Sequence, residues 1–563
     1  MAQPLSQPVA RPELRDYHDE EDDYNDDKDG NTTYSQFACI GVGFSGIALG
    51  ATLKRWHNIQ DVRFFERRPD IGGTWSANRY PGCAVDIPGF LYSFSFAPNP
   101  DWTGILPAAD EIRAYLRRVA DRYGVTARTS FGAHVIACHW RSRSRRWRLV
   151  VRYPDDGGRI VRHDCRFLFG ATGVLVHPKD PGLVGLDSFR GRCFHTASWP
   201  ADLDLSDKRV VVVGNGCTAS QVIPAIIGQC RHLSQFIRSR QWFLQSPPSF
   251  TIPPSVHWLL AHVPGLLSFL RLVVFFVHEL HGRVYPMTAA GHRRRAAEAS
   301  ATLSFVRSTA PAQFHAMLEP DYAPGCKRRV LGTDYVRSLN APNISVTEEP
   351  IVEVLPDGVR SRDGAFTPAD VIILASGFLT GRFMHGIDVR GSDGRTLDQH
   401  WKQYGGAEAY NCCALSHFPN MFMLLGPNTI TGHTSCVMAI ENGVNYALRV
   451  IRPILDSPDA FVEVKPEAEA RYSRDLQQAL GKTVYLSGCI SWYNQEGPDG
   501  RKWNSISYPR SQAEFWYRCL FPVRRDWNYV GAPHATSRSK PTLLAVAAAV
   551  LGALWLLWRN RGP

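Results

Sequence analysis

Gly41-Val42-Gly43-Phe44-Ser45-Gly46 is the most informative short stretch of this chain. The apolar residues 34–40 before it predict a buried strand, and residues 47–56 after it predict a helix. A second predicted strand, residues 62–65, ends at Glu66, 25 positions after Gly41. This order of strand, glycine loop, helix, strand and acid is typical of a dinucleotide-binding Rossmann unit. The residues expected to approach a pyrophosphate are Gly41, Gly43 and Gly46, and Glu66 is expected to bind a ribose.

A second unit of the same kind begins at residue 209. The apolar run 209–213 leads into Gly214-Asn215-Gly216-Cys217-Thr218-Ala219, and residues 221–227 can continue as a helix. The next predicted strand ends in Phe236-Ile237-Arg238-Ser239, with an arginine where the first unit has an acid. Because a guanidinium binds a phosphate group well, Arg238 predicts that this unit prefers NADPH to NADH.

Two such units predict an α/β protein with two Rossmann-like dinucleotide-binding domains, one inserted within the other. Between the loops, residues 134–170 alternate in hydropathy around a turn and predict a small antiparallel meander. The strand-like residues 371–374 and 421–425 are expected to return to the first sheet. The expected boundaries are 34–203 and 371–530 for the discontinuous first domain, and 204–370 for the second, which includes a helical insert.

The composition describes a globular chain with a basic body. The net charge is +11, yet residues 1–30 hold ten acidic and three basic side chains, so residues 1–33 are expected to be a disordered acidic tail. The sequence shows no zinc-finger spacing or RNA-recognition signature, so no nucleic-acid partner is predicted. The basic body suits dinucleotides and an anionic membrane surface better. The thirteen scattered cysteines are expected to be reduced thiols in a cytosolic environment, and no metal site is predicted.

Two further stretches match signatures of a known enzyme family. Residues 189–200 fit the spacing Phe-x-Gly-x-x-x-His-x-x-x-Trp-Pro just before the second glycine loop. Residues 72–86 read Gly-Gly-Thr-Trp-Ser-Ala-Asn-Arg-Tyr-Pro-Gly-Cys-Ala-Val-Asp and match a second signature. With both, the chain resembles the class I Baeyer–Villiger monooxygenases of the flavin-containing monooxygenase superfamily, close to those of filamentous fungi, over about residues 36–530.

The resemblance implies FAD and NADPH as cofactors and assigns residues to each. Flavin contacts would fall on Gly41, Gly43, Gly46, Glu66, Thr74, Trp75, Ser76, Ala77, Asp86, Tyr92, Val135 and Cys436. NADPH contacts would fall on Ala84, Val85, Asp86, Asn215, Gly216, Cys217, Thr218, Ala219, Ser220, Gln221, Arg238, Ser239, Lys327 and Arg328. The chain has Cys83-Ala84-Val85 where the family often has an arginine and a cysteine before the aspartate, a departure on the nicotinamide side.

The resemblance also implies the reaction, which inserts one oxygen atom of O2 next to a ketone and gives an ester or lactone. Arg328 would be catalytic, because an arginine stabilises negative charge on oxygen without giving up its proton. Asp86 would also be catalytic, orienting Arg328 through a carboxylate–guanidinium pair. Lys327 would hold the 2′-phosphate. His195 and Trp199, in the linker between the domains, would take part in domain movement rather than proton transfer.

Other functions stay open at this point. A flavin monooxygenase that oxidises nitrogen or sulfur shares both glycine loops but usually lacks the Trp199-Pro200 ending. A flavin disulfide reductase needs a paired-cysteine motif that this sequence lacks. A non-catalytic, membrane-attached scaffold would keep the fold, although the intact loops and Lys327-Arg328 favour an enzyme. The apolar region 255–285 suggests that the ketone is a bulky, apolar secondary metabolite.

Two apolar segments concern membranes. Residues 265–277 are interrupted by Arg271 and too short to span a bilayer, so a buried or interfacial helix beside the substrate pocket is expected. Residues 542–558 contain no charge and would reach about 26 Å as a helix, close to the thickness of the endoplasmic reticulum bilayer. A C-terminal transmembrane helix at 541–558 is therefore expected, with a packed C-terminal helix as the alternative. The catalytic domains would then face the cytosol.

Overall fold

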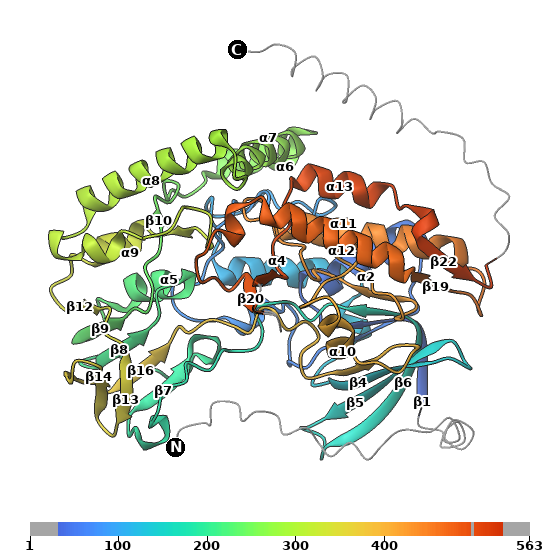
Figure 1. Cartoon of the computed structure of the whole chain (residues 1–563), viewed down its shortest axis with the longest axis horizontal. Helices are drawn as coiled ribbons and strands as arrows, with labels where there is room; N and C mark the ends of the chain where they lie inside the picture. The colour runs from blue at the N-terminus through green and yellow to red at the C-terminus, as the bar shows by residue number, and fades with distance from the viewer. Residues whose placement is uncertain (1–31, 497–499, 501, 533–563) are drawn as a thin grey trace, which may run out of the picture.

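Figure 1 shows the computed structural model, which describes residues 32–496, 500 and 502–532. Two helix-covered sheets lie next to each other, and a row of helices runs along one side of both. The expected transmembrane helix at 541–558 and nearly all of the expected acidic tail lie outside the described residues. Thr32 and Thr33, which the tail boundary included, instead begin strand β1 (Thr32–Ile40), because they pair with β6.

The first sheet carries the first glycine loop. Its strands are ordered β17-β4-β5-β6-β1-β2-β3, and β18 also pairs with β6. The predicted meander is confirmed, because β4, β5 and β6 pair antiparallel, while β1 runs parallel to β2 and β6. The other strands of this sheet are β2 (Val62–Phe65), β3 (Thr129–Ser130), β4 (His134–Arg141), β5 (Arg146–Tyr153), β6 (Arg159–Gly170), β17 (Asp388–Arg390) and β18 (Met421–Met423).

Helix α2 (Phe44–His57) directly follows the first glycine loop and lies in the larger hydrophobic core. Its residues 44–53 are all buried, since α2 packs against α4 (Ala109–Arg122) on one side and α11 (Cys436–Ile451) on another. A helix surrounded in this way must be apolar around its circumference, and the sequence of α2 meets that requirement. The glycine loop is therefore held on a rigid base.

The second sheet carries the second glycine loop, and all its strands run parallel in the order β12-β9-β8-β16-β7. Helix α5 (Cys217–Ile226) follows the loop and continues through Pro224. The strands are β7 (Arg192–His195), β8 (Arg209–Val213), β9 (His232–Phe236), β12 (Ile344–Thr347) and β16 (Val371–Leu374).

The prediction that residues 371–374 return to the first sheet is wrong. They form β16, which lies between β7 and β8 in the second sheet. A short apolar run suits the centre of either parallel sheet, so its composition does not identify its partners. The second sheet therefore extends from Arg192 to Leu374, beyond the expected 204–370 at both ends. The prediction for the next strand is confirmed, because β18 joins the first sheet through β6.

The helical insert consists of α6 (Pro254–His262), α7 (Leu266–His281) and α8 (Ala289–Thr309). Leu267 is the only buried residue of α7, so of the two alternatives expected for residues 265–277 a buried helix is wrong and an interfacial helix stays a prediction. Among the described residues, no single helix is long and apolar enough to cross a bilayer. Together, α6 and the helical segment Leu266–Val284 are long and apolar enough for a membrane span, but the two are bent by 103° relative to each other.

Smaller elements complete the described chain. The remaining strand pairs and sheets are β10 (Phe243–Leu244) with β11 (Val330–Leu331), β13 (Ile351–Leu355) with β14 (Gly358–Ser361) and β15 (Phe366–Pro368), β19 (Phe461–Val464) with β22 (Trp527–Val530), and β20 (Asn494–Glu496) with β21 (Lys502–Asn504). The remaining α-helices are α3 (Thr74–Ala77), α9 (Thr333–Ser338), α10 (Leu397–Lys402), α12 (Pro466–Gly481) and α13 (Gln512–Leu520).

Two cysteines correct the expectation that all thirteen are thiols. Cys326 and Cys489 form a disulfide, with their Cα atoms 6.3 Å apart. The two are separated by 163 residues, so only the packing of their loops brings them together. The other eleven cysteines are free, as expected.

Candidate active site

The two glycine loops have the same backbone design. Gly41 has φ +102°, and a Cβ there would lie 2.5 Å from the carbonyl oxygen of Ala171, just after β6. Gly214 has φ +135°, and a Cβ there would lie 2.4 Å from the carbonyl oxygen of Ala375, just after β16. The first position of each loop therefore requires a glycine, because a side chain there would collide with the carbonyl that follows the neighbouring parallel strand.

Both loops lead into a helix whose first turn is available to an anion. Gly43 caps α2 and Gly216 caps α5, and in neither described helix does a side chain bond the first turn or an acid stand in it. The N–H groups of such a first turn attract phosphate groups. The backbone therefore fits the pyrophosphate of a dinucleotide at each loop.

The second signature lies against the first loop. A Cβ on Gly73 would come within 2.9 Å of the Cα atom of Gly43, so the two glycines lie back to back. Gly73 also caps α3, the helix formed by Thr74, Trp75, Ser76 and Ala77. The structure therefore brings these predicted flavin contacts to the same loop as Gly41, Gly43 and Gly46.

Glu66 lies at this loop, as its position after β2 predicts. Its carboxylate accepts hydrogen bonds from the backbone N–H of Val42 at 2.9 Å and of Arg68 at 3.0 Å. A carboxylate has four lone-pair sites, so these bonds orient Glu66 and leave capacity for ribose hydroxyls. Val135 lies on β4, two residues after Ala133, whose N–H bonds the carbonyl of Glu66.

Arg328 and Asp86 form the predicted pair. Arg328 donates to Asp86 Oδ2 from Nε at 3.1 Å and from Nη2 at 2.5 Å. The charge of Asp86 raises the pKa of Arg328 well above its usual value, against the opposing effect of burial. About a quarter of each side chain is exposed, 27% for Arg328 and 26% for Asp86. A permanent positive charge is therefore held at a partly accessible position.

Residues from both domains surround this pair. Cys217, the first residue of α5, lies within hydrogen-bonding reach of Arg328; burial raises the pKa of Cys217 and the charge of Arg328 opposes that rise. Cys436 begins α11 on the other side, where its Sγ lies 3.8 Å from Tyr92 Oη. Trp75 Nε1 donates to the same Tyr92 oxygen at 3.2 Å. The pair thus lies where the predicted flavin and NADPH residues meet.

Gln221 links the two sets directly. Its Nε2 donates to the carbonyl of Ala84 at 2.9 Å, and its Oε1 accepts from Tyr80 Oη at 2.9 Å. Gly82 packs under the same turn, since a Cβ there would lie 2.4 Å from the carbonyl oxygen of Gln221. The segment Ala84, Val85 and Asp86 is therefore fixed against α5, although it departs from the family pattern.

Arg238 and Lys327 share one end of the second sheet. Burial lowers the pKa of Lys327, and the nearby charge of Arg238 lowers it further, while Asp321 raises it. Lys327 Nζ lies 4.3 Å from the centre of the Tyr322 ring. Asn215 Nδ2 donates to the carbonyl of Ser239 at 3.2 Å, which joins the glycine loop to the same turn. Arg238 in the turn after β9 and Lys327 in the segment before β11 interact electrostatically, and two such cations suit a phosphate group.

His195 and Trp199 lie within the second sheet, since His195 ends β7 and Trp199 follows in the connection from β7 to β8, so the prediction that they lie in the linker between the domains is wrong. His195 Nδ1 accepts from the N–H of Ala197 at 3.1 Å, and Nε2 donates to the carbonyl of Gly377 at 3.1 Å. Burial lowers the pKa of His195 to about 4, so the imidazole is neutral near pH 7. Trp199 stacks edge-on with Phe194, with the ring centres 5.2 Å apart. His195 therefore ties the end of β7 to the loop after β16, Trp199 packs on β7, and their role in domain movement stays a prediction.

Known proteins resemble this chain along most of its length. Residues 39–107 match the family model described as an NAD(P)-binding Rossmann-like domain. A Baeyer–Villiger monooxygenase of Streptomyces coelicolor is 34% identical over 85% of this chain and 89% of its own length. The FAD-binding monooxygenase ktnD of Aspergillus niger is 31% identical over 93% of this chain and 89% of its own length. The chain belongs to the Baeyer–Villiger monooxygenase family.

Solved structures agree with the fold of this family member. Cyclohexanone monooxygenase from Rhodococcus sp. Phi1 bound to NADP+ is 24% identical, has a TM-score of 0.77, and is matched over 89% of this chain and 100% of its own. OTEMO in complex with FAD and NADP is 24% identical, has a TM-score of 0.76, and is matched over 88% of this chain and 99% of its own. The two-domain arrangement is thus that of known monooxygenases.

Two residues of the site are missed by motif reasoning. Tyr493 lies within hydrogen-bonding reach of Arg328, and its pKa is raised by burial. Gln235 is fully buried under the second loop, where Nε2 donates to the carbonyl of Gly214 at 2.9 Å and Oε1 accepts from Tyr335 at 2.8 Å. Tyr493 follows the loop that holds Cys489, and neither residue stands in a recognisable spacing.

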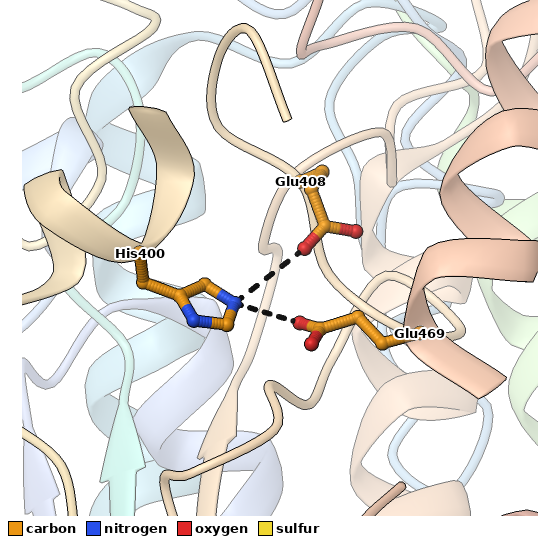
Figure 2. Close-up of side chains that lie close together, drawn as sticks. All are labelled: His400, Glu408 and Glu469. Atoms are coloured by element: carbon orange, nitrogen blue, oxygen red, sulfur yellow. Dashed lines mark hydrogen bonds and ion pairs between the residues drawn. The ribbon is translucent and has the colours of Figure 1, made fainter. Parts of the chain in front are cut away.

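Figure 2 shows a separate buried cluster of His400, Glu408 and Glu469 in this monooxygenase. Their ligand atoms lie within 4.8 Å of one another, as in a metal site. Glu469, however, already accepts from His400 Nε2 at 3.0 Å, Tyr404 Oη at 3.2 Å and both donors of Ser416. Burial and the charge of Glu469 raise the pKa of Glu408 well above its usual value. A protonated Glu408 beside an ionised Glu469 fits these pKa directions, while both carboxyl oxygens of Glu408 are buried without a hydrogen-bond partner among the described residues.

Proposed function

We propose that this monooxygenase uses FAD and NADPH to insert one oxygen atom of O2 next to a ketone, giving an ester or lactone. The observation that carries the proposal is the Arg328–Asp86 pair at the meeting point of the two domains. Asp86 keeps Arg328 charged. Because Arg328 holds its proton, it can stabilise negative charge on the ketone oxygen when the carbonyl is attacked.

The residues fit both cofactors. Gly41, Gly43 and Gly73 allow close backbone approach at the first loop, and Glu66 suits a ribose, so the first domain would hold FAD. The second loop with Arg238 and Lys327 would hold NADPH. Bound FAD, once reduced by NADPH, would supply the activation of O2, which side chains do not provide.

The proposed substrate is a bulky, apolar ketone of the kind found among secondary metabolites. Support comes from α7, which borders the site through bonds to the first domain. Arg271 of α7 donates to Ser93 Oγ at 2.7 Å, next to Tyr92, and His278 donates to the carbonyl of His433 at 3.0 Å, near Cys436. The inward apolar residues Leu270, Val274 and Phe275 of this helix pack against the same core and suit an apolar substrate nearby.

The proposed cellular position is the endoplasmic reticulum membrane, with the catalytic domains in the cytosol. Residues 541–558 would be the anchor. This segment contains no charged residue, and basic residues lie on both sides of it. The residues in question are Arg538, Lys540, Arg559 and Arg561.

The proposed reaction is tested on purified, flavin-loaded enzyme with NADPH and a panel of ketones of increasing size, read by mass spectrometry. Products that gain one oxygen atom and hydrolyse as esters or lactones are expected, with larger apolar ketones preferred. Oxygenated amines or sulfides without any ester would indicate the N- or S-oxygenating alternative. A protein that binds both cofactors but consumes no NADPH with O2 would be a scaffold.

A further inference from the structure

Helix α7 exposes a broad apolar side at the surface, where an ordinary surface helix exposes polar residues. Its polar side chains face the protein, because Arg271 bonds Ser93, His278 bonds His433, and Glu279 accepts from His433 Nε2 at 2.9 Å. Leu267 is buried and Leu270, Val274 and Phe275 pack against the core, but six other large apolar side chains face outward. The exposed apolar residues are Phe269, Leu272, Val273, Phe276, Val277 and Leu280, with Phe269 63% and Phe276 58% exposed.

The neighbouring helices extend this apolar surface. On α6, which packs against α7, Trp258 and Leu259 are exposed. On α13, Trp516 and Tyr517 are exposed, and α13 lies next to α7 because the N–H of Gln512 donates to Glu279 at 3.0 Å. Tryptophan and tyrosine favour the boundary between lipid and water. Figure 1 shows α6, α7 and α13 along one side of the molecule.

On α6, α7 and the start of α8 the exposed charge has one sign, while on α13 Glu514 is paired with Arg510. Between residues 254 and 297 the only acidic residue is Glu279, which is turned inward against His433 and Gln512. Arg283, Arg293 and Arg294 are exposed in the same stretch. An apolar surface with exposed arginines suits the anionic, cytosolic leaflet of a membrane.

We propose that the outer face of α6 and α7 inserts into the interface of an anionic lipid bilayer, as a membrane contact separate from the C-terminal segment. The surface lies in the plane of the membrane rather than crossing it, because the bonds of Arg271, His278 and Glu279 hold α7 to the first domain and the two helices are bent by 103°. The same helix borders the proposed site, so an apolar ketone dissolved in lipid would reach the enzyme at this face.

The test uses the full-length holoenzyme in phosphatidylcholine vesicles, with and without phosphatidylserine, that contain a photoactivatable phospholipid. After illumination, mass spectrometry locates the lipid adducts. Adducts are expected on peptides from 254–281, more with phosphatidylserine, and not on peptides from 351–368, which carry the exposed apolar Val352 and Phe366 in the β13–β15 sheet.

A double variant supplies the decisive comparison. Leu272→Ser with Phe276→Ser should lower the adducts on 254–281 about tenfold, because two large apolar groups no longer enter the lipid. Val352→Ser with Phe366→Ser, the matched control, should change nothing. Unchanged melting temperature and flavin content exclude misfolding. Adducts on the C-terminal segment alone, crosslinks of that segment or of a second copy to α7, or adducts independent of the α7 substitutions would overturn the proposal.

Discussion

At the scale of single residues, the role of Arg328 in stabilising negative charge on oxygen can be tested directly. Its Nε and Nη2 both donate to one oxygen of Asp86, so the guanidinium is oriented as well as charged. Arg328→Ala should lower ketone oxygenation by about 10²–10³-fold, because one electrostatic partner of the developing oxygen charge is lost. Flavin reduction by NADPH should persist, and NADPH oxidation should release hydrogen peroxide, both measured by stopped-flow and peroxide assays.

Two control variants show whether the loss of activity is specific to the guanidinium of Arg328. Arg328→Lys should restore little, because an ammonium donates from a single nitrogen and lacks the planar fork from which Nε and Nη2 both reach Asp86. Arg337→Ala, at an exposed position on α9, should behave as the parent enzyme. Near-normal ester formation by Arg328→Ala would contradict the assignment of this site.

Arg238 is expected to select the nicotinamide cofactor. Arg238→Ala should raise the KM for NADPH by about 10–100-fold, the effect of losing a hydrogen bond to a charged group worth about 1.5–3 kcal/mol. The KM for NADH should hardly change, because NADH lacks the 2′-phosphate. Steady-state kinetics with both cofactors measure this. Equal use of NADH and NADPH by the parent enzyme would show that Arg238 and Lys327 do not bind the 2′-phosphate.

Glu408 gives a pH prediction. Its pKa is raised in the folded enzyme by burial, so the unfolded chain loses this proton at lower pH than the folded enzyme does. The stability contributed by Glu408 is therefore present below about pH 4.3, the ordinary glutamate pKa, and declines as the pH rises. Glu408→Gln, which mimics the protonated group, should stabilise the enzyme relative to the parent by about 1–3 kcal/mol at pH 8 and less at pH 5.

Thermal unfolding across this pH range provides the measurement, with Glu469→Gln as the comparison. Although burial opposes it, the hydrogen bond from His400 lowers the pKa of Glu469, so this carboxylate is ionised in the folded enzyme. Glu469→Gln should destabilise at every pH above 5. If Glu408→Gln destabilises as much, Glu408 is ionised and the cluster holds a cation instead.

At the scale of elements, the Cys326–Cys489 disulfide joins the loop before Arg328 to the loop before Tyr493. Titration of the denatured enzyme should find eleven thiols before reduction and thirteen after it. Cys489→Ser should lower the free energy of unfolding by about 2–4 kcal/mol, and a reductant should lower that of the parent alone. Disulfides are uncommon in the cytosol, so thirteen thiols in the enzyme as isolated would restore the sequence-based expectation.

At the scale of the whole molecule, deletion of residues 539–563 should move the enzyme from membranes to the soluble fraction in high salt. It should retain its flavin, because these residues lie outside both described sheets. Fractionation in low and high salt, with flavin absorbance, measures this. A full-length enzyme that is soluble without detergent would contradict the anchor.

Much of the site can be predicted from local sequence, because the conformation of a glycine loop depends on the residues directly before and after it. Gly41 and Gly214 were each predicted from the strand before and the helix after, and both have the positive φ that such a turn needs. Other contacts depend on residues far apart in the chain. Tyr493 reaches Arg328 only because the disulfide-bearing loops pack together, and Gln235 supports Gly214 from a neighbouring strand.

The sequence by itself determined the two nucleotide loops, the elements next to them and, through two signatures, the family. These depend on residues within about one βαβ unit, where strand, turn and helix preferences act together. Only the tertiary structure decided that β16 joins the second sheet, that Cys326 meets Cys489, and that α7 turns its apolar side outward. These three features have the same physical reason. The strand partner, the disulfide partner and the exposed helix face are set by the packing of surfaces that are far apart in the sequence. An apolar run or a cysteine does not by itself indicate which distant residues it will contact.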